Sequence, residues 1–186
     1  MNKLKISQVQ FQASHIPALN AKINEKSFNN TLKFKPHLIC TPECSNIITN
    51  DKNFLLLNAP YQNTCPVLKM AKNFAKKNKV NINLGSLLLK VKKQRKLVNR
   101  SFFIDNHGVI KKTYDKIHMF DVKINNNEKH QESYLFKAGN KIIFTKINNI
   151  KLGMTICYDL RFPNLYRQLA KKDCSIILVP AAFTRP

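Results

Sequence analysis

Apolar and polar residues follow one another along the chain in a pattern that predicts strands and helices in turn. Residues 4–11 alternate apolar and polar positions, as a strand does, and residues 17–34 then place apolar side chains at helical spacing. A short apolar strand over residues 37–42 stops at a proline. After an irregular stretch over residues 51–64, an amphipathic helix begins near Val67.

The middle of the chain predicts further strands and one long loop. Strands are expected over residues 80–90 and 101–105, and a turn at Gly108 leads into the next strand. Residues 111–136 show little regular pattern, and a long loop in a compact domain is usually functional. Residues 141–157 predict a β-hairpin with a two-residue turn.

A strand, a sharp turn and a helix are predicted around Cys157. The second strand of the hairpin ends in this cysteine, and Pro163 then opens a helical pattern that runs to about residue 173. Such a turn would lift the sulfur clear of the sheet, and a nearby helix N-terminus favours the thiolate. A buried structural cysteine is the alternative. Residues 175–183 predict a last strand, apolar on both faces, of the kind found in covered sheets.

The composition is that of a globular protein. The chain has 186 residues, of which 44% are apolar and 9% aromatic, enough for one domain with a core. The formal net charge of +22 suggests nucleic acid or an anionic membrane as a possible partner. The lysines are scattered among asparagines without an aromatic-interleaved basic motif, so a codon bias explains the charge at least as well. We therefore expect neither nucleic acid nor a membrane as a partner.

The five cysteines indicate neither a disulfide framework nor a zinc site. Their number is odd, no C-x-x-C pair occurs, and no His cluster lies at ligand spacing. The N-terminus lacks the apolar core of a signal peptide, and no stretch reaches the roughly eighteen apolar residues of a membrane span. These features predict a cytoplasmic protein in a reducing compartment.

Charged residues stand at two further places where catalytic groups are found. Glu43 follows the strand over residues 37–42, at the end where an α/β protein places such groups, and Lys116 lies in the irregular stretch. Glu132 is a possible fourth member beside Cys157. Alone, the glutamate would more often be a solvated strand end and the lysine one surface lysine among many.

Three segments that carry these residues resemble the signature segments of the nitrilase superfamily of carbon-nitrogen hydrolases. They are Thr41-Pro-Glu43-Cys, Tyr114-Asp-Lys116-Ile-His-Met-Phe-Asp121 and Ile156-Cys157-Tyr-Asp-Leu-Arg-Phe-Pro163. Their order and neighbours match, and the resemblance runs from Leu4 to the last residue. The residues around the cysteine are similar to those of the omega-amidase and deaminated-glutathione-amidase branch, which makes nitrile hydrolysis the less favoured activity. The resemblance implies an α/β fold, a four-layer α-β-β-α sandwich.

The resemblance also implies hydrolysis of the terminal amide of a small carboxylic acid through a cysteine thioester. Cys157 would attack the carbonyl carbon, and Glu43 would carry the proton to the leaving ammonia. Lys116 and the backbone N–H of Tyr158, as a substrate-binding residue, would stabilise the oxyanion. Glu132 would orient the lysine and the substrate. No metal or organic cofactor is implied.

The residues also suggest a group that binds the substrate and leave alternative functions open. Arg161 is a candidate for binding a substrate carboxylate, because a guanidinium group forms bidentate hydrogen bonds with a carboxylate. An intramolecular bridge to Asp159 is its alternative role. Within the family, the alternative activity is that of an N-carbamoyl-amine hydrolase. Outside it, the alternative is an inactive truncated remnant or a non-catalytic binding protein that uses a basic face.

Domains of this family continue well beyond the segment matched by residues 179–186. We therefore expect residues 1–186 to form a single carbon-nitrogen hydrolase domain that lacks roughly its last third, with a sandwich incomplete at the C-terminus. Part of the usual dimer interface would be missing, and the complete form is expected to be a homo-oligomer. Because domains are stable by only about 5 to 15 kcal/mol, such a loss could leave the chain unfolded or inactive.

Overall fold

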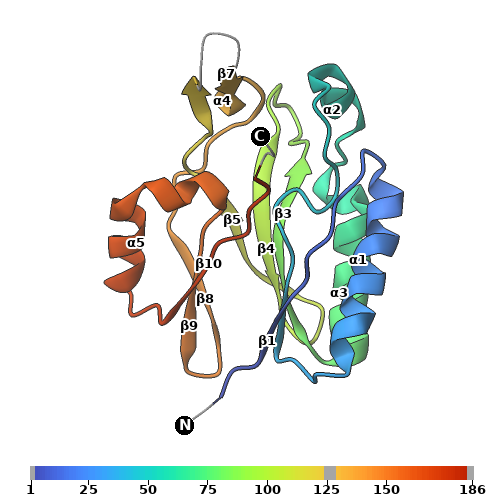
Figure 1. Cartoon of the computed structure of the whole chain (residues 1–186), viewed down its shortest axis with the longest axis vertical. Helices are drawn as coiled ribbons and strands as arrows, with labels where there is room; N and C mark the ends of the chain where they lie inside the picture. The colour runs from blue at the N-terminus through green and yellow to red at the C-terminus, as the bar shows by residue number, and fades with distance from the viewer. Residues whose placement is uncertain (1–2, 124–128, 184–186) are drawn as a thin grey trace.

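Two β-sheets lie between helices in the computed structural model, which describes residues 3–123 and 129–183 (Figure 1). The strands are β1 (Ile6–Gln8), β2 (Leu38–Cys40), β3 (Asn81–Leu89), β4 (Val98–Ile104), β5 (Ile110–Asp115), β6 (Asp121–Lys123), β7 (Lys129–Gln131), β8 (Ile143–Ile147), β9 (Ile150–Met154) and β10 (Ile176–Leu178). The helices are α1 (Pro17–Leu32), α2 (Lys52–Asn58), α3 (Pro66–Asn78), α4 (Glu132–Leu135) and α5 (Pro163–Ala170), with 3-10 helices η1 (Gln62–Thr64) and η2 (Cys157–Arg161). The predicted α/β class is confirmed.

The sheets combine parallel and antiparallel pairing. The larger sheet has the order β1-β2-β3-β4-β5, in which β1, β2 and β3 are parallel and the pairs β3-β4 and β4-β5 are antiparallel. The smaller sheet has the order β10-β9-β8, and β8 and β9 form the predicted hairpin. The carboxyl end of β2 and the ends of β5 and β9 lead into the segments that carry the candidate site residues.

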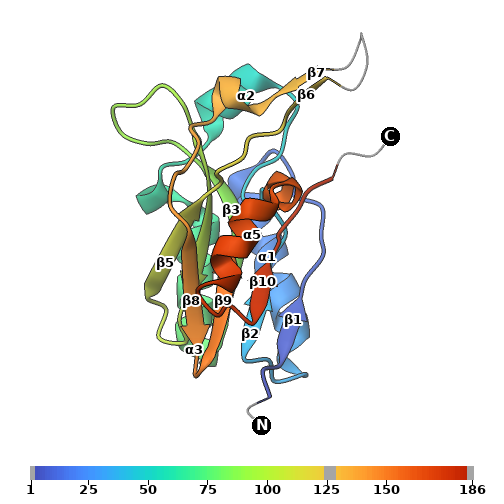
Figure 2. The same ribbon diagram turned by 90° about the vertical axis from the view of Figure 1, so that its left-hand side faces the viewer.

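Helices α1 and α3 cover the outer face of the larger sheet (Figures 1 and 2). Each begins with a proline at its first turn, where the missing N–H costs no helical hydrogen bond. Phe28 of α1 and Phe74 of α3 meet edge to face with ring centroids 5.2 Å apart. Both rings pack with Ile39, Ile82 and other buried side chains of the sheet. This core holds the strands from which Glu43 and Lys116 follow.

A second core lies between the two sheets. Phe103 and Tyr114 of the larger sheet pack with Leu152, Met154 and Leu178 of the smaller one. Helix α5 covers the other face of the smaller sheet, so the layers run helix pair, sheet, sheet, helix (Figures 1 and 2). The segment that connects β9 of the smaller sheet to α5 therefore lies beside the larger sheet. This segment contains Cys157.

Two stretches predicted to be irregular contain regular structure. Residues 51–64 form α2 and η1, because Asp51 caps α2 by accepting a hydrogen bond of 3.0 Å from Phe54 N. In residues 111–136 the antiparallel strand β5 continues to Asp115, and β6, β7 and α4 follow. Residues 124–128 of that stretch lie outside the described residues. Strand β5 pairs with the preceding strand β4, and β6 pairs with β7, so hairpin pairing accounts for the extra order in this stretch.

The last predicted strand is much shorter than expected. Residues 175–183 were expected to be one strand, but only Ile176–Leu178 pairs with β9. Beyond it the backbone turns to the candidate site, where Pro180 O accepts a hydrogen bond of 2.8 Å from Cys157 N. The apolar pattern of this stretch is therefore divided between a short strand and a segment that supports the cysteine.

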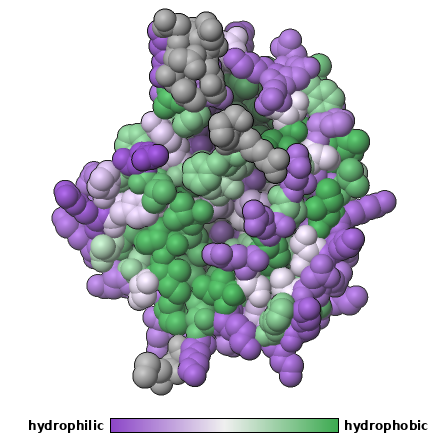
Figure 3. Space-filling view, in the orientation of Figure 1, coloured by the Kyte–Doolittle hydropathy of each residue, from purple (hydrophilic) through white to green (hydrophobic). Residues whose placement is uncertain are grey.

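An apolar surface lies on the side of the molecule where both sheets end. Among the described residues, β10 pairs only with β9 and β1 only with β2. Figure 3 shows hydrophobic side chains gathered over β10 and the face beside it, and Val179 next to that strand is exposed. Unpaired strand edges of this kind are places where other chain segments can add. No helix in the described part of the chain is long and apolar enough to cross a membrane.

Candidate active site

Glu43 is held by three segments that are distant in the sequence. It follows β2 and is only 7% exposed. Its Oε1 accepts hydrogen bonds of 3.1 Å from Lys116 Nζ and 2.9 Å from Asn99 Nδ2. Its Oε2 accepts a bond of 3.0 Å from Ala182 N. A buried carboxylate with this many donors has a fixed orientation, as a general base requires.

Lys116 lies between two carboxylates at the end of β5. Its Nζ is 3.1 Å from Glu43 Oε1 and 2.9 Å from Glu132 Oε2, and the residue is 2% exposed. Burial by itself lowers the pKa of this ammonium, but the charges of the two carboxylates outweigh burial and raise the pKa above its ordinary value. Lys116 is therefore a permanent cation inside the protein.

Glu132 is the first residue of α4, a short helix in the stretch that was predicted to be irregular. Its Oε2 also accepts a hydrogen bond of 2.7 Å from Phe120 N. The carboxylate thus connects Lys116 to the backbone that follows it. The structure brings together Glu43, Lys116 and Glu132 as the sequence predicts, while their chemical roles stay predictions.

Cys157 lies at the sharp turn that the sequence predicts. It is the first residue of η2 and has a positive φ of 47°, a left-handed conformation that is uncommon for a residue with a side chain. Its thiol hydrogen-bonds to Glu43. The cysteine therefore faces the Glu43–Lys116 pair directly, and its strained backbone is fixed by the bond to Pro180 O.

The expectation of a thiolate at Cys157 is wrong for the resting protein. Burial and the neighbouring carboxylate of Glu43 raise the pKa of its thiol to about 12, although Lys116 opposes this rise. The expected help from a helix N-terminus is small, because α5 begins only at Pro163, beyond η2. A neutral thiol has to lose its proton to a base as it attacks.

Asp159 is a structural residue of the site, which the sequence analysis considered only as a partner of Arg161. Its buried carboxylate accepts hydrogen bonds from Ile156 N at 2.9 Å, Tyr114 Oη at 2.6 Å and His118 N at 3.0 Å. The ring Nδ1 of His118 lies 2.7 Å from the same carboxylate. Asp159 stands three residues after Ile156, whose apolar side chain cannot accept a hydrogen bond, so the sequence lacks the Ser or Thr that marks a capping box.

Asn99 is a residue of the site that the sequence analysis missed. This buried side chain of β4 donates to Glu43 Oε1 and lies 3.4 Å from Glu132 Oε1, while its backbone carbonyl accepts from Lys116 N at 2.9 Å. Its own Oδ1 is buried and has no partner among the described residues. Arg100 and Ser101 follow it in the same strand, and it lies before the predicted strand over residues 101–105, so no local sequence signal points to it.

Tyr158 and Arg161 lie on η2 beside the cysteine. The ring of Tyr158 meets Phe120 and Phe162 edge-on, with centroids 5.0 Å and 5.6 Å away. Arg161 is exposed, and within the described residues it is not a partner of Asp159. Their roles toward a substrate stay predictions. In the part of the chain that the structure describes, no three His, Cys, Asp or Glu side chains are grouped to hold a metal ion.

A cysteine at a strand-to-turn elbow beside a buried carboxylate and lysine has the parts that a cysteine-dependent hydrolase requires. A sequence model of the carbon-nitrogen hydrolase family matches residues 12–185. The chain belongs to this family, and the resemblance to the nitrilase superfamily is confirmed.

Relatives with known names support this assignment. Deaminated glutathione amidase of Dictyostelium discoideum is 34% identical over 192 residues, which cover 100% of this chain and 66% of that protein. The protein of the same name from Yersinia enterocolitica is 35% identical over 150 residues, covering 80% of this chain and 52% of its own length. The chain thus spans between 52% and 66% of these two relatives.

Solved structures share the fold. The crystal structure of the Caenorhabditis elegans NitFhit protein matches with a TM-score of 0.87 at 28% identity, over 96% of this chain and 44% of that one. Nit3 of Saccharomyces cerevisiae matches with a TM-score of 0.82 over 97% of this chain and 65% of that one. Its identity of 23% makes it a likeness in fold alone.

Proposed function

We propose that this chain supplies the catalytic residues of an amidase, which hydrolyses the terminal amide of a small carboxylic acid to the acid and ammonia. The observation that carries the proposal is the contact of one carboxylate, Glu43, with both the Lys116 cation and the Cys157 thiol. Similarity to deaminated glutathione amidases favours an amide over a carbamoyl or nitrile substrate. We treat residues 1–186 as one domain of the family's four-layer sandwich, and the whole protein as a homo-oligomer.

The first half of the reaction forms a thioester. Glu43 takes the proton of the Cys157 thiol while the sulfur attacks the amide carbonyl carbon, and the π electrons of the carbonyl move to its oxygen. Lys116, together with the backbone N–H of Tyr158, stabilises the negative charge on that oxygen. The protonated Glu43 then gives its proton to the nitrogen, the C–N bond breaks and ammonia leaves.

The second half regenerates the enzyme. A water molecule loses a proton to Glu43 as its oxygen attacks the thioester carbon. The C–S bond breaks when the tetrahedral intermediate collapses, and the sulfur of Cys157 recovers a proton from the glutamic acid. The raised thiol pKa fits this scheme, because a sulfur that prefers to be protonated needs an adjacent base to remove its proton and regains it from the glutamic acid when it leaves.

Glu132 and Asn99 position these groups without taking part in bond changes. The glutamate directs Lys116 Nζ through its contact of 2.9 Å, and the asparagine directs Glu43 Oε1 through its bond of 2.9 Å. Arg161 has no ion pair among the residues that the structure describes, and it would bind the carboxylate at the other end of the substrate, which would select amides of small carboxylic acids.

The test is ammonia release by the full chain with deaminated glutathione, an omega-amide of a dicarboxylic acid and an N-carbamoyl amine. We expect release from at least one of the first two, none after Cys157→Ala, and no change after Cys174→Ala. Glu43→Gln should also abolish release, and intact-mass measurement should show no acyl group on Cys157, because forming the thioester already requires the proton transfers of Glu43. Equal release by the chain and by its Cys157→Ala variant, or release from the carbamoyl amine alone, would contradict the proposal, and so would the absence of release from every substrate.

The role of Lys116 can be separated from binding. Lys116→Met should lower kcat by about a hundredfold or more with KM changed far less, as for loss of an oxyanion donor. Lys116→Arg keeps a cation between the two carboxylates and controls for their repulsion, so it should keep the thermal stability that the methionine variant loses. A methionine variant with unchanged kcat and raised KM would place this lysine in substrate binding instead.

A further inference from the structure

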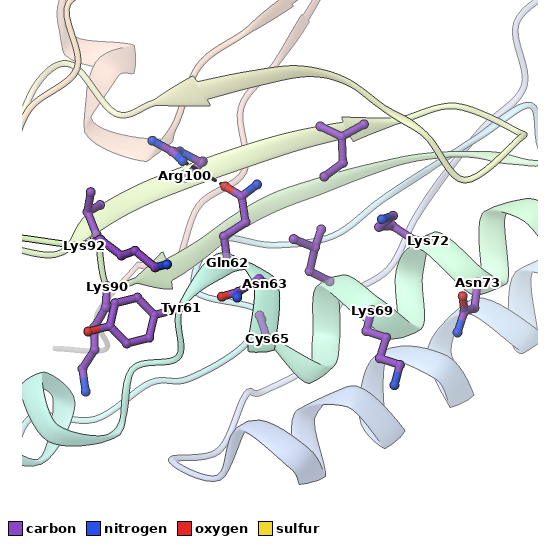
Figure 4. Close-up of a pocket in the computed structure, with 13 residues that line it drawn as sticks. Tyr61, Gln62, Asn63, Cys65, Lys69, Lys72, Asn73, Lys90, Lys92 and Arg100 are labelled. Atoms are coloured by element: carbon purple, nitrogen blue, oxygen red, sulfur yellow. Dashed lines mark hydrogen bonds between the residues drawn. The ribbon is translucent and has the colours of Figure 1, made fainter.

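A cavity of about 580 Å³ lies apart from the candidate active site (Figure 4). It is bordered by η1, α3, the turn after β3, and strands β4 and β5, and none of the candidate catalytic residues lines it. Its volume falls within the range of about 300 to 1,000 Å³ that small-molecule sites occupy. We call it the basic cavity, because its charged lining residues are all cations: Lys69, Lys72, Lys90, Lys92 and Arg100.

The cations of the basic cavity come from segments far apart in the sequence. Lys69 and Lys72 are neighbours on one face of α3, whereas Lys92 comes from the turn after β3. Among the described residues, none of these three forms an ion pair with a carboxylate. Three like charges around one cavity repel one another and attract a multivalent anion.

The other two cations of the cavity already have partners. Arg100 forms an ion pair with Asp115, with Nη2 2.8 Å from Oδ2, and Gln62 accepts from its Nη1 at 3.0 Å (Figure 4). Lys90 Nζ donates to Leu57 O at 2.8 Å and lies 6.0 Å from the centroid of the Tyr61 ring. Within the described part of the chain, only Arg100 of the five cations is neutralised by a carboxylate, and Lys90 is held in place by its bond to Leu57 O. Lys69, Lys72 and Lys92 are therefore the cations left to contact a ligand.

The uncharged lining suits an organic ligand better than a bare ion. Tyr61 is 42% exposed and presents an aromatic ring, while Asn63 and Asn73 present amide groups. Leu68 and Ile110 supply apolar surface at the same cavity. A planar ring can pack on such a wall, and amides can hydrogen-bond to its edge or to a sugar.

We propose that the basic cavity binds the polyphosphate chain of a small phosphorylated molecule, of the nucleoside diphosphate or triphosphate class. Lys69, Lys72 and Lys92 neutralise the phosphates, and Tyr61 packs against the base. All five cations line the same cavity, whereas a nucleic-acid backbone requires an extended stripe. The site lies behind the catalytic group: Arg100 lines the cavity, whereas its neighbour Asn99 on β4 donates to Glu43 on the opposite face.

The test is calorimetric titration of the full chain with ATP, ADP, inorganic tripolyphosphate and adenosine at low and moderate salt. We expect ATP and ADP to bind, adenosine to bind at least tenfold more weakly, and affinity to fall as salt rises. Binding of tripolyphosphate as tight as that of ATP would show that the phosphate chain alone is recognised. Absence of binding by every phosphate compound, or equal binding of adenosine, would overturn the proposal.

Two double variants with the same change in charge separate the cavity from general electrostatics. Lys69→Gln with Lys72→Gln should weaken ATP binding at least tenfold. Lys76→Gln with Lys77→Gln changes exposed lysines of the same helix outside the cavity and should leave it within twofold. Equal losses in both pairs, together with tighter binding of a single-stranded RNA than of ATP, would indicate a nucleic-acid surface instead. Equal losses without RNA binding would also overturn the proposal. No outcome depends on amidase activity, so this test and that of the proposed function fail independently.

Discussion

The phenol of Tyr114 donates a hydrogen bond of 2.6 Å to Asp159 Oδ2, and both residues are fully buried. The bond joins the end of β5, just before Lys116, to the 3-10 helix that begins with Cys157. Burial and the charge of Asp159 raise the pKa of the phenol, so it remains a donor over the whole working pH range. The relative position of the lysine and the cysteine therefore depends on a contact that neither makes.

Tyr114→Phe should destabilise the protein by about 1 to 3 kcal/mol, because it removes a donor from a buried carboxylate. The change is measured as a shift of the urea unfolding midpoint. Tyr166→Phe is the matched control, since the Tyr166 hydroxyl makes only a 3.4 Å contact with Thr155 Oγ1. Equal stability of the two variants would show that the bond to Asp159 carries no net stabilisation.

Local sequence patterns predicted the elements whose conformation is determined by residues close together in the sequence. The helix begun by Pro17, the β8-β9 hairpin and the turn at Cys157 all follow from spacing and turn residues, and all are present. The three segments that resemble the family also brought Glu43 and Lys116 together correctly. A motif carries long-range information that periodicity lacks, because it reflects contacts already known from a fold.

Long-range contacts account for what the sequence did not show. The role of Asn99 depends on β4 lying beside the ends of β2 and β5, and no neighbour in the sequence reveals this. The thiol pKa of Cys157 was expected in the wrong direction, because burial and the charge of Glu43 come from tertiary structure. The basic cavity likewise gathers lysines that look scattered along the chain.

Gly85→Ala should be strongly destabilising. A Cβ at Gly85 would contact Thr41 O and would lie 2.5 Å from both Pro42 O and Pro180 Cβ. These atoms belong to the segments that hold Glu43 and Cys157, and backbone cannot retreat as a flexible side chain can, so we expect a cost of about 1 to 3 kcal/mol or more. Thermal unfolding measures the loss.

Gly153→Ala provides the comparison for this overpacking. The atoms nearest to a Cβ at Gly153 are side-chain ends, Ile177 Cδ1 and Leu169 Cδ1, each 2.9 Å away. Because these methyl groups can shift, the loss of stability should be smaller than at Gly85. The reverse order would mean that the loop around Glu43 adapts more easily than the contact between α5 and β9.

The pH dependence of alkylation should report the raised pKa of Cys157. With a thiol pKa of about 12, the thiolate fraction and therefore the rate of iodoacetamide labelling should rise about tenfold per pH unit from pH 7 to pH 10 without a plateau. Peptide mass mapping gives the rate at this cysteine and at Cys174 separately. A plateau below pH 9 would contradict the assignment.

Glu43→Gln tests the cause of that raised pKa. Removing the carboxylate removes one of the two main influences that raise the thiol pKa, while Lys116 remains to lower it. The labelling profile should therefore move to lower pH, and the rate at pH 8 should increase even though amide hydrolysis is lost. Slower labelling at pH 8 in this variant would show that Glu43 activates the resting thiol rather than holding it protonated.

Asn99→Asp should replace a donor by a like charge at the centre of the site. The new carboxylate would face Glu43 and Glu132 where Asn99 Nδ2 now lies 2.9 Å and 3.4 Å from their oxygens, with Lys116 as the single neutralising cation. Repulsion among three carboxylates raises the pKa of the new group, and only its protonated form can donate to Glu43. At pH 8 we expect at least a tenfold loss of amide hydrolysis and a lower unfolding temperature.

Because protonation restores a donor at position 99, the ratio of variant to unmodified activity should rise as the pH falls from 8 to 5. Asn106→Asp makes the same change of charge at a half-buried turn outside the site and should show neither the loss nor the pH-dependent recovery. If the relative activity of Asn99→Asp stays constant across this range, the hydrogen bond from Asn99 does not position Glu43 as the base. Asn99→Ala would then be expected to keep full activity, since the amide would serve only to fill space between the two carboxylates.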